Sequence, residues 1–115
     1  KLLNTRCFIS QGNVMNLPYE KGTFDLITAF ETVYFWGNLQ KTFNEVHRVL
    51  KNGGLFLICC EASDPSDETW TSRIDGMVVH SAQDLESCLA RCGFSNITTH
   101  RRNKENICVI AHKIQ

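Results

Sequence analysis

The fold is decided by residues 39–60, which read LQKTFNEVHRVLKNGGLFLICC. Apolar side chains recur in the first part at spacings of four, three and four, the period of a helix with one buried face. They are Leu39, Phe43, Val46 and Leu50. Residues 55–60 are almost continuously apolar, which predicts a buried strand. Asn52-Gly53-Gly54 separates the two patterns and predicts the end of the helix, because these residues accept a left-handed backbone.

Four other runs complete the expected sheet. Residues 24–30 and 107–111 are nearly as apolar as residues 55–60, which predicts strands in the middle of a sheet, covered on both faces. Residues 7–10 and 96–100 are more polar and suit edge strands.

A second helix is expected between the apolar run at residues 55–60 and the run at residues 96–100. Ser81 is its expected N-cap and Gly93 its expected end. Leu85, Cys88, Leu89 and Cys92 form its apolar face. Both helices are expected to cover a sheet, and the alternation of strands and helices predicts an α/β fold with a mainly parallel sheet.

Length and charge set the class of protein. The 115 residues are enough for one domain, which we expect to span residues 1–115. Twelve basic and twelve acidic residues balance, which excludes a strongly basic nucleic-acid binder. No apolar run is long enough to cross a bilayer, so a soluble, cytoplasmic protein is expected. The first residue is Lys1 rather than Met, which indicates a processed or partial chain.

The six cysteines predict neither a disulfide framework nor a metal site. Cys59 and Cys60 are adjacent, and Cys88 and Cys92 are one helical turn apart within an apolar stripe. Zinc sites use different spacings, and cysteine in apolar runs behaves as a small buried hydrophobe. No metal is expected.

Four motifs follow one another at specific distances. They are residues 11–19 (QGNVMNLPY), 22–27 (GTFDLI), 45–54 (EVHRVLKNGG) and 90–94 (ARCGF). In this order they resemble the class I S-adenosylmethionine-dependent methyltransferases, and in particular the type 11-like small-molecule family. The resemblance implies a Rossmann-like, mainly parallel sheet with an antiparallel C-terminal strand.

The family's element order also implies what this chain lacks. It assigns residues 7–10 to the third strand, 24–30 to the fourth and 55–60 to the fifth, with the last two runs as the sixth and seventh. The first two strands of the methyltransferase fold are then missing, together with the family's glycine-rich loop and the acidic residue that holds the cofactor ribose. The resemblance therefore implies a partial, truncated domain.

The resemblance places an S-adenosylmethionine site on two segments. Asn13 would accept from the adenine amino group and the Val14 amide would donate to the ring, with Gly12 allowing close approach. An ordinary turn is the alternative for this segment. Phe30 and Glu31 would lie beside the methionine end, and a strand end with a solvated glutamate is the alternative there.

The methyl acceptor would lie near an aromatic cluster. Tyr34 and Trp36 are expected substrate contacts by the resemblance, and core packing is their alternative role. Trp70 and Met77, in the irregular segment after residue 60, belong either to a lid over the acceptor or to loop packing.

The implied function is methyl transfer to an unidentified small molecule, which needs alignment of donor and acceptor more than a dedicated catalytic residue. If the acceptor needs a base, His80, Glu31 and Tyr34 are all conceivable. The competing hypothesis is a cofactor-incompetent fragment that serves as an interaction module. Loss of two strands would expose the edge of residues 24–30, which predicts either a homodimer through that edge or direct pairing of residues 7–10 beside it.

Overall fold

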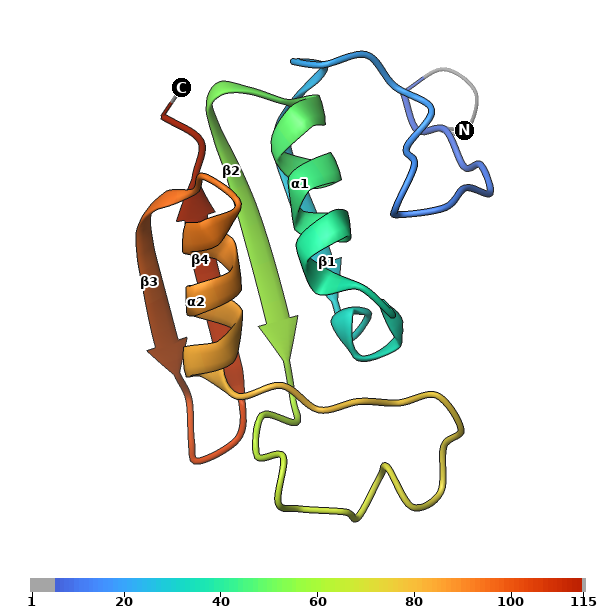
Figure 1. The fold of residues 1–115 in the computed structure, drawn as a ribbon, viewed down its shortest axis with the longest axis vertical. Coiled ribbons are helices and arrows are strands. Elements are labelled where there is room, and N and C mark those ends of the chain that lie inside the picture. Colours follow the sequence, from blue (N-terminus) through green and yellow to red (C-terminus); the bar gives the residue numbers. More distant parts are fainter. Residues whose placement is uncertain (1–5, 115) are drawn as a thin grey trace.

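The protein is an α/β unit with one four-stranded sheet and two α-helices, seen in a computed structural model that describes residues 6–114 (Figure 1). Its elements, in chain order, are β1 (Phe24–Phe30), the short 3-10 helix η1 (Val33–Phe35), α1 (Leu39–Val49), β2 (Leu50–Cys60), α2 (Ala82–Arg91), β3 (Ser95–Arg101) and β4 (Ile107–His112). The predicted α/β class is confirmed.

The strands lie in the order β1-β2-β4-β3. β1 pairs in parallel with β2, whereas β4 runs antiparallel to both β2 and β3, so this sheet is mixed. The expected antiparallel C-terminal strand is β4, and the expected polar edge strand is β3. The apolar strand β1 forms the other edge, as loss of the preceding strands would require.

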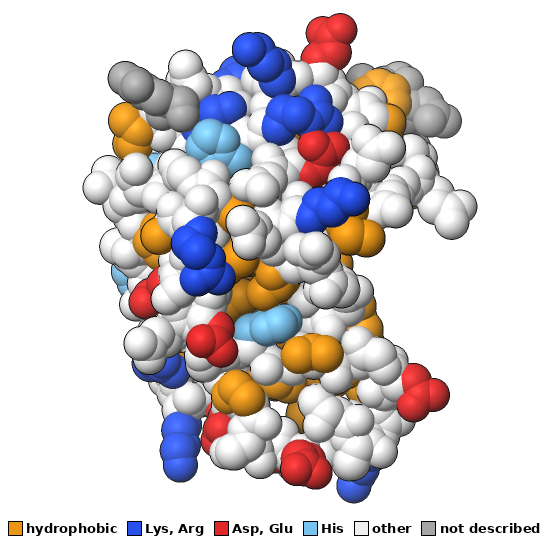
Figure 2. All heavy atoms as spheres, in the orientation of Figure 1, with side chains coloured by type: hydrophobic (Ala, Val, Ile, Leu, Met, Phe, Trp, Pro, Cys, Tyr) orange, Lys and Arg blue, Asp and Glu red, His pale blue; other side chains and the backbone are white. Residues whose placement is uncertain are grey.

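Both helices lie on the same face of the sheet (Figure 1). Phe43 of α1 stacks edge to face on Phe56 of β2 with ring centroids 5.6 Å apart, and Leu85 and Leu89 of α2 are fully buried beside them. Figure 2 views this side and shows hydrophobic side chains surfacing in its middle, with Lys and Arg side chains gathered mainly above them.

The opposite face of the sheet, here called the bare face, carries no helix among residues 6–114. Coverage of strands on both faces was therefore a wrong expectation for this structure. Leu26 is 54% exposed and Phe30 is 57% exposed on β1, where only Ala29 is buried. The reason is topological, because both connections that contain a helix cross the sheet on one side.

The ends of α2 agree with the sequence prediction. Ser81 is the N-cap, and its hydroxyl accepts a hydrogen bond from the Asp84 amide at 3.1 Å. The helix stops at Arg91, and Gly93 has a φ of 95°, a left-handed value that glycine adopts without strain.

The end of α1 differs from the prediction, because the helix stops at Val49 and not at residues 52–54. Leu50 is fully buried and begins β2, where it pairs with Phe24. The Lys113 ammonium donates to the carbonyls of His47 (2.7 Å) and Leu50 (2.8 Å), which satisfies the helix end. The glycines instead form an irregular start of the strand.

Residues 7–10 form no strand, so their predicted pairing beside β1 is wrong. Phe8 is 74% exposed and Ile9 is 81% exposed, which shows that this segment reaches no core. The N-terminal segment is instead held against α1 at residues 17–19. Arg48 of α1 donates to the carbonyls of Tyr19 (2.8 Å) and Leu17 (3.0 Å), and to Glu45 at 2.6 Å.

Two kinds of feature are missing from residues 6–114. No helix there is long and apolar enough to cross a membrane. In the same part of the chain, no cluster of three or more His, Cys, Asp or Glu side chains could hold a metal ion. All six cysteines are free thiols.

Candidate functional site

The candidate site lies where the parallel strands β1 and β2 end. Open α/β sheets bind their ligands at the carboxyl ends of parallel strands. Glu31 directly follows β1 and Glu61 directly follows β2, so both carboxylates reach this edge. Two cavities open beside them, and both are lined by Glu31 and Glu61.

The smaller cavity has a volume of about 270 Å³ and mostly apolar walls. Its lining consists of Glu31, Tyr34, Phe35, Glu61, Ala62, Trp70, Ile74 and Met77. Trp70 and Met77 come from the irregular segment between β2 and α2, which is tied down by the Val78 amide donating to the Tyr34 carbonyl at 2.9 Å. The structure thus brings Trp70 and Met77 together with Tyr34, as a lid over an acceptor would require.

Tyr34 and Glu31 form a hydrogen-bonded pair in this cavity. The Tyr34 hydroxyl donates to Glu31 Oε1 at 2.6 Å and accepts from the Ala62 amide at 3.1 Å. The side chain is only 4% exposed. Burial, followed by the hydrogen bond to Glu31, raises the pKa of Tyr34 well above its ordinary value. Tyr34 therefore stays a neutral donor that fixes the position of the Glu31 carboxylate.

The backbone of Glu31 is in a left-handed conformation. Its φ is 57°, and its amide donates to the Cys59 carbonyl at 2.9 Å. A non-glycine residue in this region costs about 1–3 kcal/mol and is common at functional sites. The surrounding hydrogen bonds to β2 and Tyr34 hold the residue there. This conformation turns the carboxylate toward both cavities.

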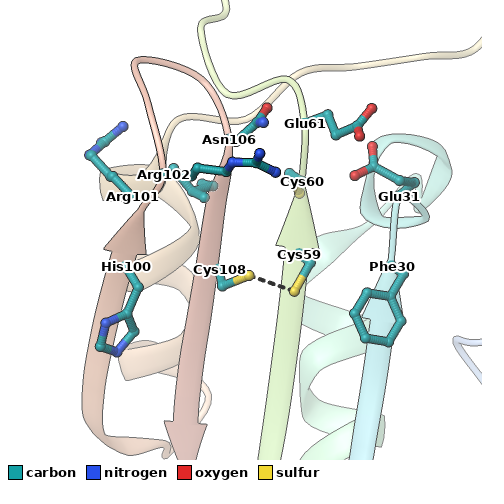
Figure 3. Close-up of a pocket in the computed structure, with 11 residues that line it drawn as sticks. Phe30, Glu31, Cys59, Cys60, Glu61, His100, Arg101, Arg102, Asn106 and Cys108 are labelled. Carbon is teal, nitrogen blue, oxygen red and sulfur yellow. Dashed lines mark hydrogen bonds between the residues drawn. The ribbon is translucent and has the colours of Figure 1, made fainter.

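The larger cavity, of about 570 Å³, lies on the bare face (Figure 3). The carboxylates of Glu31 and Glu61 line it at the ends of β1 and β2, and Arg101, the last residue of β3, and Arg102, in the hairpin that joins β3 to β4, line its other side. Cys59 and Cys108 face each other across β2 and β4, with their sulfur atoms 2.7 Å apart. Phe30 also lines this cavity.

The predicted adenine-binding residues lie elsewhere. Asn13 and Val14 are part of a tight turn that directly follows Gly12, and in it the Asn16 amide donates to the Asn13 carbonyl at 2.9 Å. The Asn13 side chain accepts from the Met15 amide at 2.9 Å, so it already serves that turn.

The two predicted halves of the cofactor site are not brought together. Figure 1 shows the N-terminal segment apart from the carboxyl end of β1, where Phe30 and Glu31 lie. None of the described cavities is lined by both groups. The cofactor roles of Gly12, Asn13, Val14, Phe30 and Glu31 therefore stay predictions.

Trp36 and His80 lie outside the two cavities. Trp36 is half-buried and packs edge to face on Phe43, with ring centroids 6.4 Å apart, which favours its core-packing role. His80 is half-buried, and its Nε2 atom finds no hydrogen-bond partner among residues 6–114. Burial lowers the pKa of His80 below its ordinary value, so the ring is held neutral near neutral pH.

Sequence reasoning missed several residues of the site, among them Glu61, Cys59 and Cys108. Glu61 could have been found, because it follows a predicted strand just as Glu31 does. Cys59 and Cys108 belong to predicted strands, but only the observed order of β2 and β4 makes them neighbours. No local signal in the sequence indicates that contact.

The chain is similar to known methyltransferases. A family model described as a methyltransferase domain matches residues 2–58, about half of the chain. The demethylmenaquinone methyltransferase of Symbiobacterium thermophilum is 44% identical over 54 residues, which cover 47% of this chain and 21% of that protein. A sterol 4-C-methyltransferase of Caenorhabditis elegans is 36% identical over 56 residues, which cover 49% of this chain and 17% of that protein.

Solved structures share the fold. A methyltransferase of Thermotoga maritima superposes with a TM-score of 0.79 at 17% identity, covering 92% of this chain and 64% of that one. The geranyl diphosphate C-methyltransferase of Streptomyces coelicolor, solved with S-adenosyl-L-homocysteine, gives a TM-score of 0.70 at 16% identity, covering 89% of this chain and 52% of that one. This chain therefore corresponds to only part of the proteins that it matches.

Proposed function

Because the chain belongs to the class I S-adenosylmethionine-dependent methyltransferases, we propose that it is the C-terminal, acceptor-binding part of a domain that methylates an apolar small molecule. The observation that carries this proposal is the Tyr34–Glu31 hydrogen bond inside an apolar cavity. S-adenosylmethionine would supply the methyl group, since the family uses it.

The walls of the smaller cavity favour an apolar acceptor. Phe35, Trp70, Ile74 and Met77 present rings and hydrocarbon to a space of about 270 Å³, which is at the small end for ligand pockets. Such a space accepts one ring system rather than a whole lipid. The relatives named above act on demethylmenaquinone and on sterols, which are largely hydrocarbon. We propose that the reacting ring of a similar acceptor enters here.

Glu31 is the proposed proton acceptor. Its carboxylate receives one hydrogen bond from Tyr34 and retains lone pairs for a proton from the acceptor. Tyr34 is a positioning residue, because the neutral phenol orients the carboxylate and is itself anchored by the Ala62 amide. His80 lines neither cavity, which argues against it as the base.

Acceptor binding can be tested by fluorescence of Trp70 in the 115-residue chain, titrated with 2,3-dimethyl-1,4-naphthoquinone, a ring probe whose blocked ring positions do not add the free thiols of the chain. We expect the probe to quench Trp70, and Trp70→Phe to remove that part of the signal. Tyr34→Phe should weaken binding about tenfold, because the cavity loses a buried donor and its wall shifts. Glu68→Gln, in the same irregular segment but outside the cavity, is the control. Unchanged affinity in Tyr34→Phe would contradict the assignment of this cavity.

Cofactor binding needs its own measurement. Calorimetric titration with S-adenosylmethionine and S-adenosylhomocysteine should give binding that Asn13→Ala weakens, if the predicted adenine contact forms when ligand enters. An absence of heat at millimolar ligand would assign cofactor binding to a longer parent domain. The proposed acceptor site would remain testable by the quinone titration.

A second candidate function, a dimerisation module, rests on the free edge of β1. The strand pairs only with β2 within residues 6–114, and Leu26 and Phe30 are exposed on it. The Glu31 amide points toward β2, so by alternation the Thr28 amide points to the open edge. Such an edge invites pairing with a second copy.

The oligomeric state tests this second candidate. Sedimentation equilibrium over a wide concentration range should show a dimer that Thr28→Pro weakens, since proline removes an outward donor without breaking the β1–β2 ladder. A chain that stays monomeric throughout the range would rule the homodimer out.

A further inference from the structure

Cys59 of β2 and Cys108 of β4 form a facing pair on the bare side of the sheet. They are direct partners in the antiparallel register, and their Sγ atoms lie 2.7 Å apart. Both side chains are half-buried, and both line the larger cavity (Figure 3). The pair is therefore open to small reagents that enter the cavity.

The backbone geometry suits a covalent link between these residues. Directly opposite residues of an antiparallel pair have Cα atoms about 4.5–5.5 Å apart, which lies inside the range of about 4.4–6.8 Å found for disulfides. The sulfur atoms need to approach only from 2.7 Å to about 2.05 Å, a change that side-chain rotation can supply. We propose that Cys59 and Cys108 are a reversible disulfide-forming modification site in the floor of the larger cavity.

The buried cysteines do not compete for either partner. Cys60 is adjacent to Cys59, but it is 3% exposed and points to the helix side, as alternation along the strand requires. Cys88 and Cys92 are buried on α2, which packs on that same side. The bare face thus presents one facing cysteine pair among residues 6–114.

A small-molecule disulfide, such as oxidised glutathione, is the proposed oxidant. Attack of one cysteine on it forms a mixed disulfide and releases one glutathione thiol. The second cysteine then attacks the protein sulfur of the mixed disulfide and expels the other glutathione thiol. In total, two protein thiols and one oxidised glutathione give one protein disulfide and two reduced glutathiones, so atoms and electrons balance.

The two steps differ in rate for a physical reason. Burial, followed by the contact with Cys108, raises the pKa of Cys59 to about 12, which keeps the thiolate scarce and the first step slow. The second step is intramolecular between groups already in contact, so mixed disulfide should not accumulate. The link would join β2 to β4 at the cavity floor and close a long loop of chain.

Peptide mapping tests the proposal directly. The 115-residue chain is incubated with oxidised glutathione, blocked with iodoacetamide and digested with trypsin without reduction. Cleavage after Lys51, Arg73, Lys104 and Lys113 places Cys59 and Cys108 on separate peptides, residues 52–73 and 105–113. We expect these peptides to appear as one cross-linked species that dithiothreitol separates, and the melting temperature to rise on oxidation and return on reduction.

Matched variants identify the sulfur atoms. Cys59→Ser and Cys108→Ser should each abolish the cross-link and trap a glutathione adduct on the remaining cysteine, whereas Cys60→Ser should form it as the wild type does. Circular dichroism checks that each variant is folded. A cross-link that survives in Cys59→Ser, or a wild-type chain that yields only mixed disulfides, would overturn the assignment. If a variant fails to fold, the wild-type peptide map alone still shows whether a cross-link or only mixed disulfides form.

Discussion

The two faces of the sheet are built from similar apolar sequence but lie in different environments. On β2, Phe56 and Ile58 are fully buried beneath the helices, whereas Leu55 and Leu57, which alternate with them, are only half-buried on the bare face. The side chains of residues 55–60 are apolar on both sides of the strand. Burial is therefore decided by which elements cross which face, and an apolar run alone does not show whether both faces are covered.

The largest loss of stability should come from a buried residue of β2, and its half-buried neighbour on the same strand provides the comparison. Ile58→Ala should destabilise the chain by about 3 kcal/mol, because it leaves a cavity in the core, and Leu57→Ala should cost less than about half of that. Urea denaturation followed by circular dichroism measures both. Equal losses would break the comparison, since they would mean that the bare face is covered in solution.

The N-cap of α2 should contribute less to the free energy of unfolding than the core residue Ile58 does. Ser81→Ala removes the acceptor for the Asp84 amide and should cost about 1 kcal/mol in the same denaturation experiment. Ser87→Ala, at an exposed position inside the helix, is the matched control and should be neutral or slightly stabilising. A control that loses as much as Ser81→Ala would refute the capping role.

The contact of the N-terminal segment with α1 should be sensitive to pH. The hydrogen bond from Arg48, helped by the Leu17 amide, lowers the pKa of Glu45 below its ordinary value of 4.5. A carboxyl group with a lowered folded-state pKa stabilises the fold above its unfolded-state pKa, and this is lost as the pH falls through the folded-state value. Glu45→Gln should remove this acid-side loss, at a cost of no more than about 1 kcal/mol at pH 7. Denaturation midpoints at a series of pH values measure it, and parallel curves for the two proteins would contradict it.

The smallest change in stability should come from a substitution on β1, at the open edge of the sheet. Leu26 is 54% exposed, so Leu26→Ala should change the stability of the monomer by less than about 0.5 kcal/mol. If the chain dimerises through this edge, the interface adds to stability, so the destabilisation by Leu26→Ala should grow with protein concentration. Melting temperatures at low and high concentration separate the two cases.

Local patterns predicted most of the elements. The apolar run at residues 24–30 matches β1 residue for residue, and Ser81 and Gly93 bound α2 as expected. Residues 7–10 failed as a strand, because a strand needs a partner and a core, and Phe8 and Ile9 find neither. The end of α1 could not be read locally, since it depends on Lys113, more than sixty residues away.

Sequence reasoning named some residues that line the candidate site, but not their arrangement. Sequence reasoning named Glu31, Tyr34, Trp70 and Met77 separately, and the smaller cavity brings them together. The left-handed backbone of Glu31 could not be foreseen, because glutamate carries no preference for it. The Cys59–Cys108 contact depends on strand order, which single-residue patterns do not encode.

The conformation of Glu31 implies a trade-off that protein engineering could exploit. Glycine would relieve the backbone at a φ of 57°, so Glu31→Gly should recover part of the stability that the lost hydrogen bond to Tyr34 removes. A screen that selects for thermostability alone would therefore tolerate small, flexible residues at position 31. Retention of glutamate there under such selection would be a sign that the carboxylate is kept for what it does rather than for how the chain folds.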